Sequence, residues 1–186
     1  MSEQLFTSAN LTADQLNAIV KKLGGEAGVM NFLRGNSEVV VKIHIIDLDA
    51  TPTTMPFDGA KVEEHNKGGK LEWKHDSFRL HLSLNQSGGK SIVGKKLCRE
   101  LENKPVLNAN LLDYLLDHPY LIPEDWKVDK QDRTRYIYFH GTYYRDLGVG
   151  GLFVRYLYFR GGHWRADYNW LDRKFGVQDH SLLLVK

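Results

Sequence analysis

Near the start of the chain, apolar residues recur with the period of an α-helix. The residues that would share one helix face are Leu16, Ile19, Val20 and Leu23. Thr12 is placed to cap this helix, and the glycine pair at 24–25 to end it. A second short helix is predicted over 26–34. Two short helices joined by glycines indicate either a packing hairpin or a DNA-reading helix-turn-helix, and the second helix offers only Asn31 and Arg34 to DNA.

Further along, hydrophobic and polar residues alternate with period two, as in a strand with one buried face. Over 38–47 the apolar positions expected to be buried are Val39, Val41, Ile43 and Ile45. A second strand is predicted over 78–84, where the apolar positions are Phe78, Leu80, Leu82 and Leu84. The segment 50–70 is rich in proline and glycine and is predicted to be a loop with one helical turn near 62–65. Another loop is expected over 85–90.

Two more helices are predicted in the middle of the chain. The helix over 93–102 places on one face Val93, Leu97 and Leu101. Pro105 closes this helix, and either Asn108 or Asn110 is placed to cap the next one, which ends at His118. The residues expected to be buried in that next helix are Leu111, Leu112, Leu115 and Leu116. Each of these two helices therefore has an apolar face that is expected to be buried.

After a charged linker at 128–133 the chain becomes aromatic, with 13 of its 21 aromatic residues between positions 136 and 175. The strands predicted here cover 135–144, 152–160 and 163–171. The glycine pair at 161–162 suits a two-residue primed turn, in which both residues take positive φ. The side chains predicted to point to one side of the last strand are Trp164, Ala166, Tyr168 and Trp170. These signals predict an antiparallel three-stranded meander.

Together these elements predict an α+β fold. It has N-terminal helices in 1–36, a central strand and helix unit in 37–130, and a C-terminal antiparallel three-stranded meander in 131–186 that could form a partial barrel. A chain of 186 residues is long enough for one or two compact domains and buries about 70% of its unfolded surface on folding. It can therefore hold a hydrophobic core.

Composition narrows the class of protein. With 42% hydrophobic and 26% charged residues the chain is of the globular type, and no apolar run approaches the roughly 20 residues that cross a bilayer, so no membrane association is expected. The first residues do not form a secretion signal, and a cytoplasmic location is expected. The single cysteine, Cys98, can form no internal disulfide and falls mid-helix, where a packing role is expected.

Fragments of two phosphate-handling motifs occur. Asp47 and Asp49 follow the first strand in an Asp-x-Asp-x-Thr segment, as in the haloacid dehalogenase phosphatases, and Lys90 follows two glycines before a helix, as in a phosphate loop. Together they would give a Mg²⁺-dependent hydrolase. The rest of each motif is missing, so a turn after a strand and a plain loop are the simpler interpretations.

The eight histidines form no closely spaced Cys and His pattern of the kind that binds zinc. The densest clusters of His with acidic residues are those at 63–65 and 75–76. We therefore expect no metal site and no cofactor, and the enzymatic hypothesis ranks behind binding.

The C-terminal strands carry the most suggestive chemistry. Between residues 133 and 175 there are eight Lys or Arg residues and three Asp, a local net charge of +5 in a chain whose formal charge is +2. Single-stranded nucleic acid binds to sheets on which bases stack on aromatic rings while arginines meet phosphates. The residues predicted to contact it are Tyr138, Tyr143, Tyr144, Arg145, Arg155, Tyr156, Tyr158, Arg160 and Arg165. The alternatives are a protein partner or self-association at this aromatic face, and an ordinary core with a solvated outer face.

Several segments resemble a group of small uncharacterised bacterial proteins known mainly from metagenomic genomes. The segments are VEEHNKGGKLEW at 62–73, the stretch from IVGKKLC to PEDWK at 92–127, and YFHGTYYRD and FVRYLYFRGGHW nearer the end, about two thirds of the chain. The resemblance implies no activity. It also implies that the proteins of this group have acidic residues at the Asp-x-Asp segment but not the threonine, which makes the match to the phosphatase motif accidental. In addition, it implies that they have an aromatic residue where this chain has His140.

Overall fold

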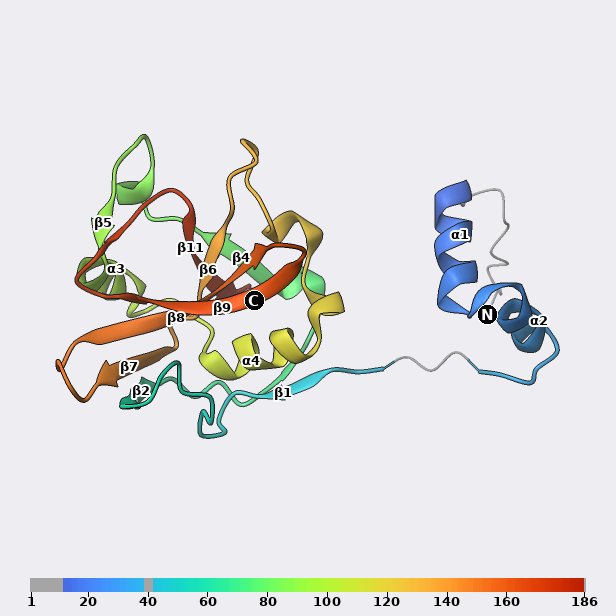
Figure 1. The fold of residues 1–186 in the computed structure, drawn as a ribbon, viewed down its shortest axis with the longest axis horizontal. Coiled ribbons are helices and arrows are strands. Elements are labelled where there is room, and N and C mark those ends of the chain that lie inside the picture. Colours follow the sequence, from blue (N-terminus) through green and yellow to red (C-terminus); the bar gives the residue numbers. More distant parts are fainter. Residues whose placement is uncertain (1–11, 39–41, 186) are drawn as a thin grey trace. The chain divides into compact units, whose positions relative to one another are not determined.

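The computed structural model describes residues 12–38 and 42–185, and the chain divides into two compact units, Met1–Lys42 and Ile43–Lys186 (Figure 1). Over the described residues the predicted α+β class is confirmed, with four α-helices and a large curled β-sheet. The smaller unit holds two of these helices. The larger unit holds the other two and all of the described strands.

The smaller unit consists of α1 (Ala13–Lys22) and α2 (Gly25–Leu33), which confirms both predicted helices. Thr12 caps α1: its side-chain oxygen accepts a hydrogen bond from the Gln15 N–H at 3.2 Å, and the Gln15 side chain accepts one from the Thr12 N–H at 2.8 Å. Gly24, at φ +90°, takes the left-handed conformation at the turn between the helices. Neither helix contains a buried residue, so the apolar face of α1 stays largely exposed.

The larger unit is built on a seven-stranded sheet in which β8 (Leu152–Arg160) is a central strand. On one edge β8 pairs antiparallel with β9 (His163–Trp170). The turn between them consists of Gly161 and Gly162, whose φ values of +63° and +81° are those of the predicted primed turn. The predicted hairpin is therefore confirmed.

The other edge of β8 is shared by β6 (Tyr136–Tyr138) and β7 (Thr142–Asp146), so the single strand predicted here is interrupted at 139–141. The interruption brings two backbones into contact. Gly141 donates an N–H hydrogen bond to the Leu107 carbonyl oxygen at 2.9 Å, and a side chain at Gly141 would lie 2.9 Å from the backbone carbon of Leu107. Glycine at this position thus allows the close approach that bends the strand.

Strands from earlier and later in the chain complete the sheet. β2 (Ala60–His65) pairs antiparallel with β7, and β11 (Asp179–Leu184) pairs parallel with β6 and antiparallel with β4 (Phe78–His81). Strands from both sides of residue 131 therefore share one sheet (Figure 1). Two short antiparallel ladders lie outside it: β1 (Ile45–Asp47) with β3 (Lys70–Glu72), and β5 (Ile92–Val93) with β10 (Lys174–Phe175).

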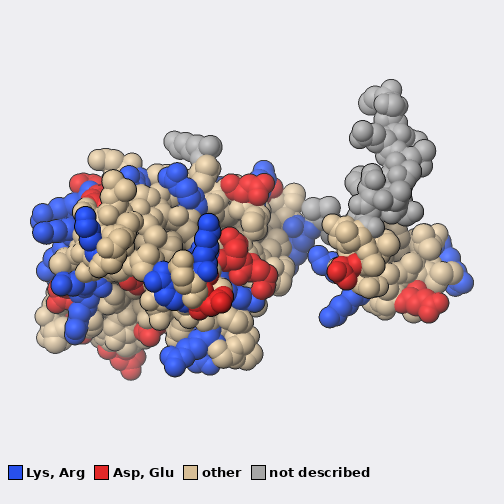
Figure 2. All heavy atoms as spheres, turned by 90° about the horizontal axis from the view of Figure 1, so that it is seen from above, with Lys and Arg blue, Asp and Glu red and all other residues tan. Residues whose placement is uncertain are grey.

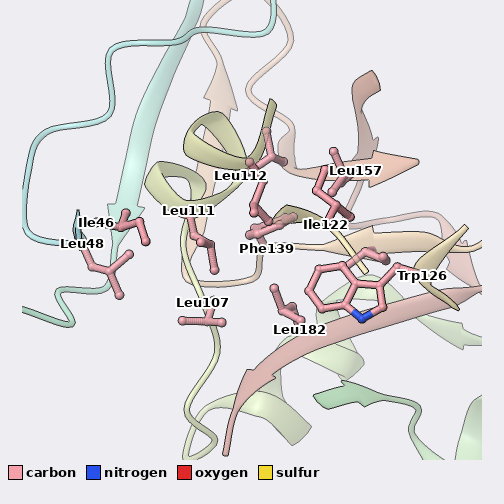
Figure 3. Packing of buried hydrophobic residues seen from close by; sticks show 12 residues of the cluster. Ile46, Leu48, Leu107, Leu111, Leu112, Ile122, Trp126, Phe139, Leu157 and Leu182 are labelled. Carbon is pink, nitrogen blue, oxygen red and sulfur yellow. The ribbon is translucent and has the colours of Figure 1, made fainter. Parts of the chain in front are cut away.

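Helices α3 (Gly94–Leu101) and α4 (Ala109–Asp117) confirm the two helices predicted in the middle of the chain. Asn108 caps α4, since its side-chain oxygen accepts a hydrogen bond from the Asn110 N–H at 3.2 Å. α4 packs on one face of the sheet and forms the largest core with it. Figure 3 shows the side chains of this core pointing toward one another: Ile46, Leu48, Leu107, Leu111, Leu112, Ile122, Trp126, Phe139, Leu157 and Leu182.

The opposite face of the sheet is covered in part by α3, β5 and β10. The buried residues of this second core are Ile92, Leu97, Leu101, Tyr138, Val154, Leu171, Phe175 and Leu183. Because side chains alternate along a strand, successive residues of β8 point to different helices. The face with Phe153 and Leu157 is named the α4 face below, and the face with Val154 and Tyr156 the α3 face.

The first predicted strand has the wrong buried face. Its residues 39–41 lie outside the described residues, and the strand that the structure describes here is β1 alone. Ile43 and Ile45 are 64% and 49% exposed, whereas His44 between them is 7% exposed. A polar side chain can take the buried position because His44 Nδ1 lies 2.7 Å from the Tyr114 hydroxyl of α4.

The helical turn predicted near 62–65 is also wrong, because these residues belong to β2. Val62 lies opposite Tyr144 of β7, and the register shifts at a bulge between Val62 and Glu64. Pairing with an existing strand thus overrides the local pattern.

Candidate nucleic-acid interface

Three tyrosine rings from two neighbouring strands lie together on the α3 face of the sheet. Tyr156 and Tyr158 are two residues apart on β8, and Tyr136 lies beside them on β6. The ring centroid of Tyr136 is 5.4 Å from that of Tyr156 and 5.9 Å from that of Tyr158, and the Tyr156 and Tyr158 centroids are 5.6 Å apart. All three side chains are half-buried. They form one aromatic patch in which part of each residue stays accessible.

Two arginines border this patch. Arg165 of β9 lies opposite Tyr158 in the ladder, and Arg160 ends β8 opposite His163, across the glycine turn. Both arginines are exposed, and neither forms an ion pair with another described residue. The aromatic patch and these two cations are named the tyrosine surface: Tyr136, Tyr156, Tyr158, Arg160 and Arg165.

Two carboxylates lie within reach of the tyrosine surface, those of Asp167 and of Asp179, which stands opposite Tyr136 on β11. Asp167 of β9 stands opposite Tyr156, and burial together with this carboxylate raises the pKa of Tyr156, so its hydroxyl remains protonated at neutral pH. Figure 2 shows Lys and Arg side chains spread over one face of the larger unit, with Asp and Glu among them. The surface charge is therefore mixed, and its positive part near the tyrosines is made by the two arginines.

Tyr138, also predicted to contact ligand, lies deeper on the same face. It is 2% exposed, and its ring centroid is 4.9 Å from those of both Tyr156 and Phe175. Its hydroxyl donates a hydrogen bond to Asp179 Oδ1 at 3.1 Å, and burial with the nearby carboxylate raises the pKa of Tyr138. Tyr138 therefore supports the patch from below.

Two other predicted contacts, Tyr144 and Arg155, lie on the opposite, α4 face. Tyr144 is fully buried and stacks on Phe153, with their centroids 5.5 Å apart. Arg155 is 4% exposed and pairs in two-pronged fashion with Asp113 of α4, through Nη2 to Oδ1 at 2.7 Å and Nη1 to Oδ2 at 3.2 Å. In this structure neither side chain reaches the tyrosine surface, and the guanidinium of Arg155 is already paired with the carboxylate of Asp113.

The last two predicted contacts, Tyr143 and Arg145, lie on β7 away from the patch. Tyr143 is half-buried beside α3 and lines a separate hollow. The Arg145 guanidinium donates to Glu63 Oε1 at 2.6 Å and to the Gly150 carbonyl oxygen at 2.8 Å. Of the nine predicted residues, the structure therefore brings together Tyr156, Tyr158, Arg160 and Arg165.

The pKa of the Glu63 carboxyl group tests whether Glu63 pairs with Arg145. The hydrogen bond from Arg145 lowers the pKa of Glu63 from its ordinary 4.5 to about 2. The contribution of this ion pair to the stability of the fold is thus fully present above pH 4.5 and is lost as the pH falls through about 2. In an NMR titration of the side-chain carboxyl carbon, we expect a midpoint near 2 in the wild type and a clear upward move in Arg145→Gln. The same midpoint in both proteins would show that the pair does not form in solution.

The structure separates the residues of the hydrolase hypothesis. Asp49 Oδ1 accepts hydrogen bonds from the Gly68 and Gly69 N–H groups at 3.0 and 2.8 Å, and Asp47 Oδ1 accepts one from the Asp49 N–H at 2.9 Å. These carboxylates therefore hold a turn next to α4. Lys90 lies in the loop before β5 and α3, which pack on the other face of the sheet. The two halves of the motif do not share a site.

Within the described ranges, His, Cys, Asp and Glu side chains nowhere gather in a group of three or more that could ligate a metal ion. The helices that the structure describes all fall short of the length and hydrophobicity of a membrane span.

Comparison of the chain with protein-family models, with curated proteins and with solved structures gives no match. Assignment of a function therefore depends on the geometry of the chain itself. Sequence reasoning missed one member of the tyrosine surface, Tyr136. The alternation of residues along its strand was the available signal, since it puts Tyr136 on the same side as Tyr138.

Proposed function

We propose that the larger unit binds single-stranded nucleic acid on the tyrosine surface. The observation that carries this proposal is the cluster of three half-buried tyrosine rings, with centroids 5.4 to 5.9 Å apart, beside two exposed arginines. Every nucleobase has a π-face, so stacking on tyrosine favours binding without demanding a particular base. The arginines lie where they can meet the phosphates that flank stacked bases.

A single strand suits this surface better than a duplex does. The bases of a single strand can be splayed out and stacked on aromatic side chains, whereas those of a duplex are already stacked on each other. The tyrosines lie on adjacent strands of a sheet, which presents several rings side by side. With two arginines as the phosphate contacts, the logarithm of the affinity should fall with the logarithm of salt concentration with a slope of about −1.4.

Fluorescence anisotropy of a labelled single strand of about 10 nucleotides, titrated with the full chain between about 50 and 200 mM salt, tests the proposal. We expect Tyr156→Ala and Tyr158→Ala each to weaken binding by about five-fold to over a hundred-fold, because each removes stacking worth about 1–3 kcal/mol per base. The double variant Arg160→Gln with Arg165→Gln should bring the salt slope close to zero.

Matched control variants lie elsewhere on the larger unit. Tyr120→Ala removes a tyrosine that is 68% exposed, and Lys67→Gln removes an exposed positive charge, and both should bind like the wild type. Circular dichroism of every variant shows whether the fold is kept. If the wild type does not bind at about 50 mM salt, or if the folded tyrosine variants bind as tightly as the controls, the proposal is wrong.

A protein interface at the same surface is the second candidate, because Tyr and Arg are residue types in which interface hot spots are enriched. Light scattering of the full chain after size-exclusion chromatography separates the two candidates. Self-association through the tyrosine surface would give a mass above that of the monomer, and Tyr158→Ala would restore the monomer mass. A monomeric wild type that binds the labelled strand supports the nucleic-acid function.

A further inference from the structure

A hollow of about 280 Å³ opens between α3, the end of β2 and the start of β7. Its floor includes Leu101 and His140, each 1% exposed, and its wall the half-buried Cys98 and Tyr143. This hollow is distinct from the tyrosine surface. A water molecule occupies about 30 Å³ in the liquid, so the space suits a molecule larger than water but at the small end of ligand size.

His140 is the unusual feature of the floor. Among the described residues, neither of its ring nitrogens has a hydrogen-bond partner. Its place is fixed by the backbone on either side of the strand interruption: the Gly141 carbonyl oxygen accepts from the Asn66 N–H at 2.7 Å, and the Gly141 N–H donates to Leu107. Burial lowers the pKa of His140 to about 3, so the ring is neutral, with one N–H donor and one acceptor to satisfy.

Buried polar groups in proteins are almost always hydrogen-bonded, and an unpaired one lowers stability. A histidine held in this position with both nitrogens unpaired therefore indicates a polar molecule that fills the hollow. Cys98 does not point to covalent chemistry, because burial raises the pKa of its thiol and keeps it protonated at neutral pH.

The rim of the hollow carries charges of both signs. Glu64 of β2 and Arg99 of α3 are exposed and line it from different elements, and Glu102 follows at the end of α3. None of the three forms an ion pair with another residue in the part of the chain that the structure describes. Opposite charges that face one hollow without pairing can each meet the opposite group of a single bound molecule.

We propose that this hollow binds a small zwitterion, a free amino acid, whose ammonium group meets Glu64, whose carboxylate meets Arg99, and whose remaining polar atoms meet His140. A simple anion would be repelled by Glu64 and Glu102, and a simple cation by Arg99. The proposal is independent of nucleic-acid binding, since no residue of the tyrosine surface takes part in it.

The test is a thermal-shift screen of the full chain against each standard amino acid at about 10 mM, followed by calorimetry of any that raises the melting temperature. We expect one amino acid, or a few related ones, to raise it and to bind saturably. The N-acetylated and the carboxamide forms of that amino acid should each bind at least ten-fold more weakly, because each lacks one of the two charges.

Variants assign the binding to the hollow. Glu64→Gln and Arg99→Gln should each weaken binding at least ten-fold, whereas Lys95→Gln, an exposed residue of the same helix, should leave it unchanged. His140→Phe should raise the melting temperature of the free protein, because it removes an unpaired buried polar group, and should weaken amino-acid binding.

The proposal is overturned if no amino acid shifts the melting temperature. It is equally overturned if the two rim variants bind the amino acid as the Lys95→Gln control does. Should His140→Phe fail to fold, the rim variants still decide the question, since both change exposed side chains.

Discussion

Replacing Asp113 with alanine should lower the free energy of unfolding by about 3 kcal/mol. The change leaves the Arg155 guanidinium 4% exposed within the sheet and without its carboxylate partner. Breaking a buried ion pair from one side is costly because the remaining charge stays desolvated. For a chain of this size the loss corresponds to a fall in melting temperature of about 6–12 °C, which differential scanning calorimetry measures.

The double variant Asp113→Leu with Arg155→Met is the matched control for this prediction. Replacing a buried pair by apolar residues of similar size is often neutral or stabilising, so the double variant should recover most of the stability that Asp113→Ala loses. A double-mutant cycle on the two positions gives the coupling energy directly. If Asp113→Ala melts within a degree or two of the wild type, the pair contributes no net stability in solution.

Phe153→Ala should lower the free energy of unfolding by about 3–5 kcal/mol. Phe153 is fully buried on the α4 face, where its ring contacts those of Tyr144, Phe57, Tyr168 and Trp170 with centroid distances of 4.9 to 5.5 Å. The substitution removes the apolar transfer energy of the ring and leaves a cavity that aromatic neighbours on a rigid sheet fill poorly. Urea denaturation of both proteins measures the difference.

Val149→Ala is the control for Phe153→Ala, because Val149 is 76% exposed in the loop between β7 and β8. Its effect should stay within about 0.5 kcal/mol. A Phe153→Ala protein as stable as this control would mean that the aromatic cluster repacks around the missing ring, and that the core here is less rigid than the structure indicates.

Helices and turns whose ends are marked by capping residues or by glycines could be predicted from the sequence. Thr12 and Asn108 cap helices where expected, and the glycine pair at 161–162 makes the expected turn. β11 could not be recognised in this way, because it lies between two other strands and buries neighbouring side chains on opposite faces: Leu182 against α4 and Leu183 against α3. A strand buried on both faces shows an apolar run in place of an alternating pattern.

The candidate site could be predicted only in part, for a related reason. Arg155 and Arg165 both alternate with aromatic residues on adjacent strands, and the sequence does not distinguish them. They differ in what covers them, since α4 lies over Arg155 and supplies Asp113 while Arg165 stays exposed. That difference depends on how the helices pack on the sheet, and local patterns carry no information on it.

The place of β11 in the sheet also bears on how the protein folds during synthesis. β11 is the last described strand in chain order, yet it lies between β4 and β6, with Leu184 opposite Phe78. Until it emerges from the ribosome, β4 has no neighbour in the sheet, and β6 has one open edge. From the synthesis of β6 until β11 inserts, the edges of β4 and β6 that β11 will join therefore stay unpaired, and the insertion of β11 closes both.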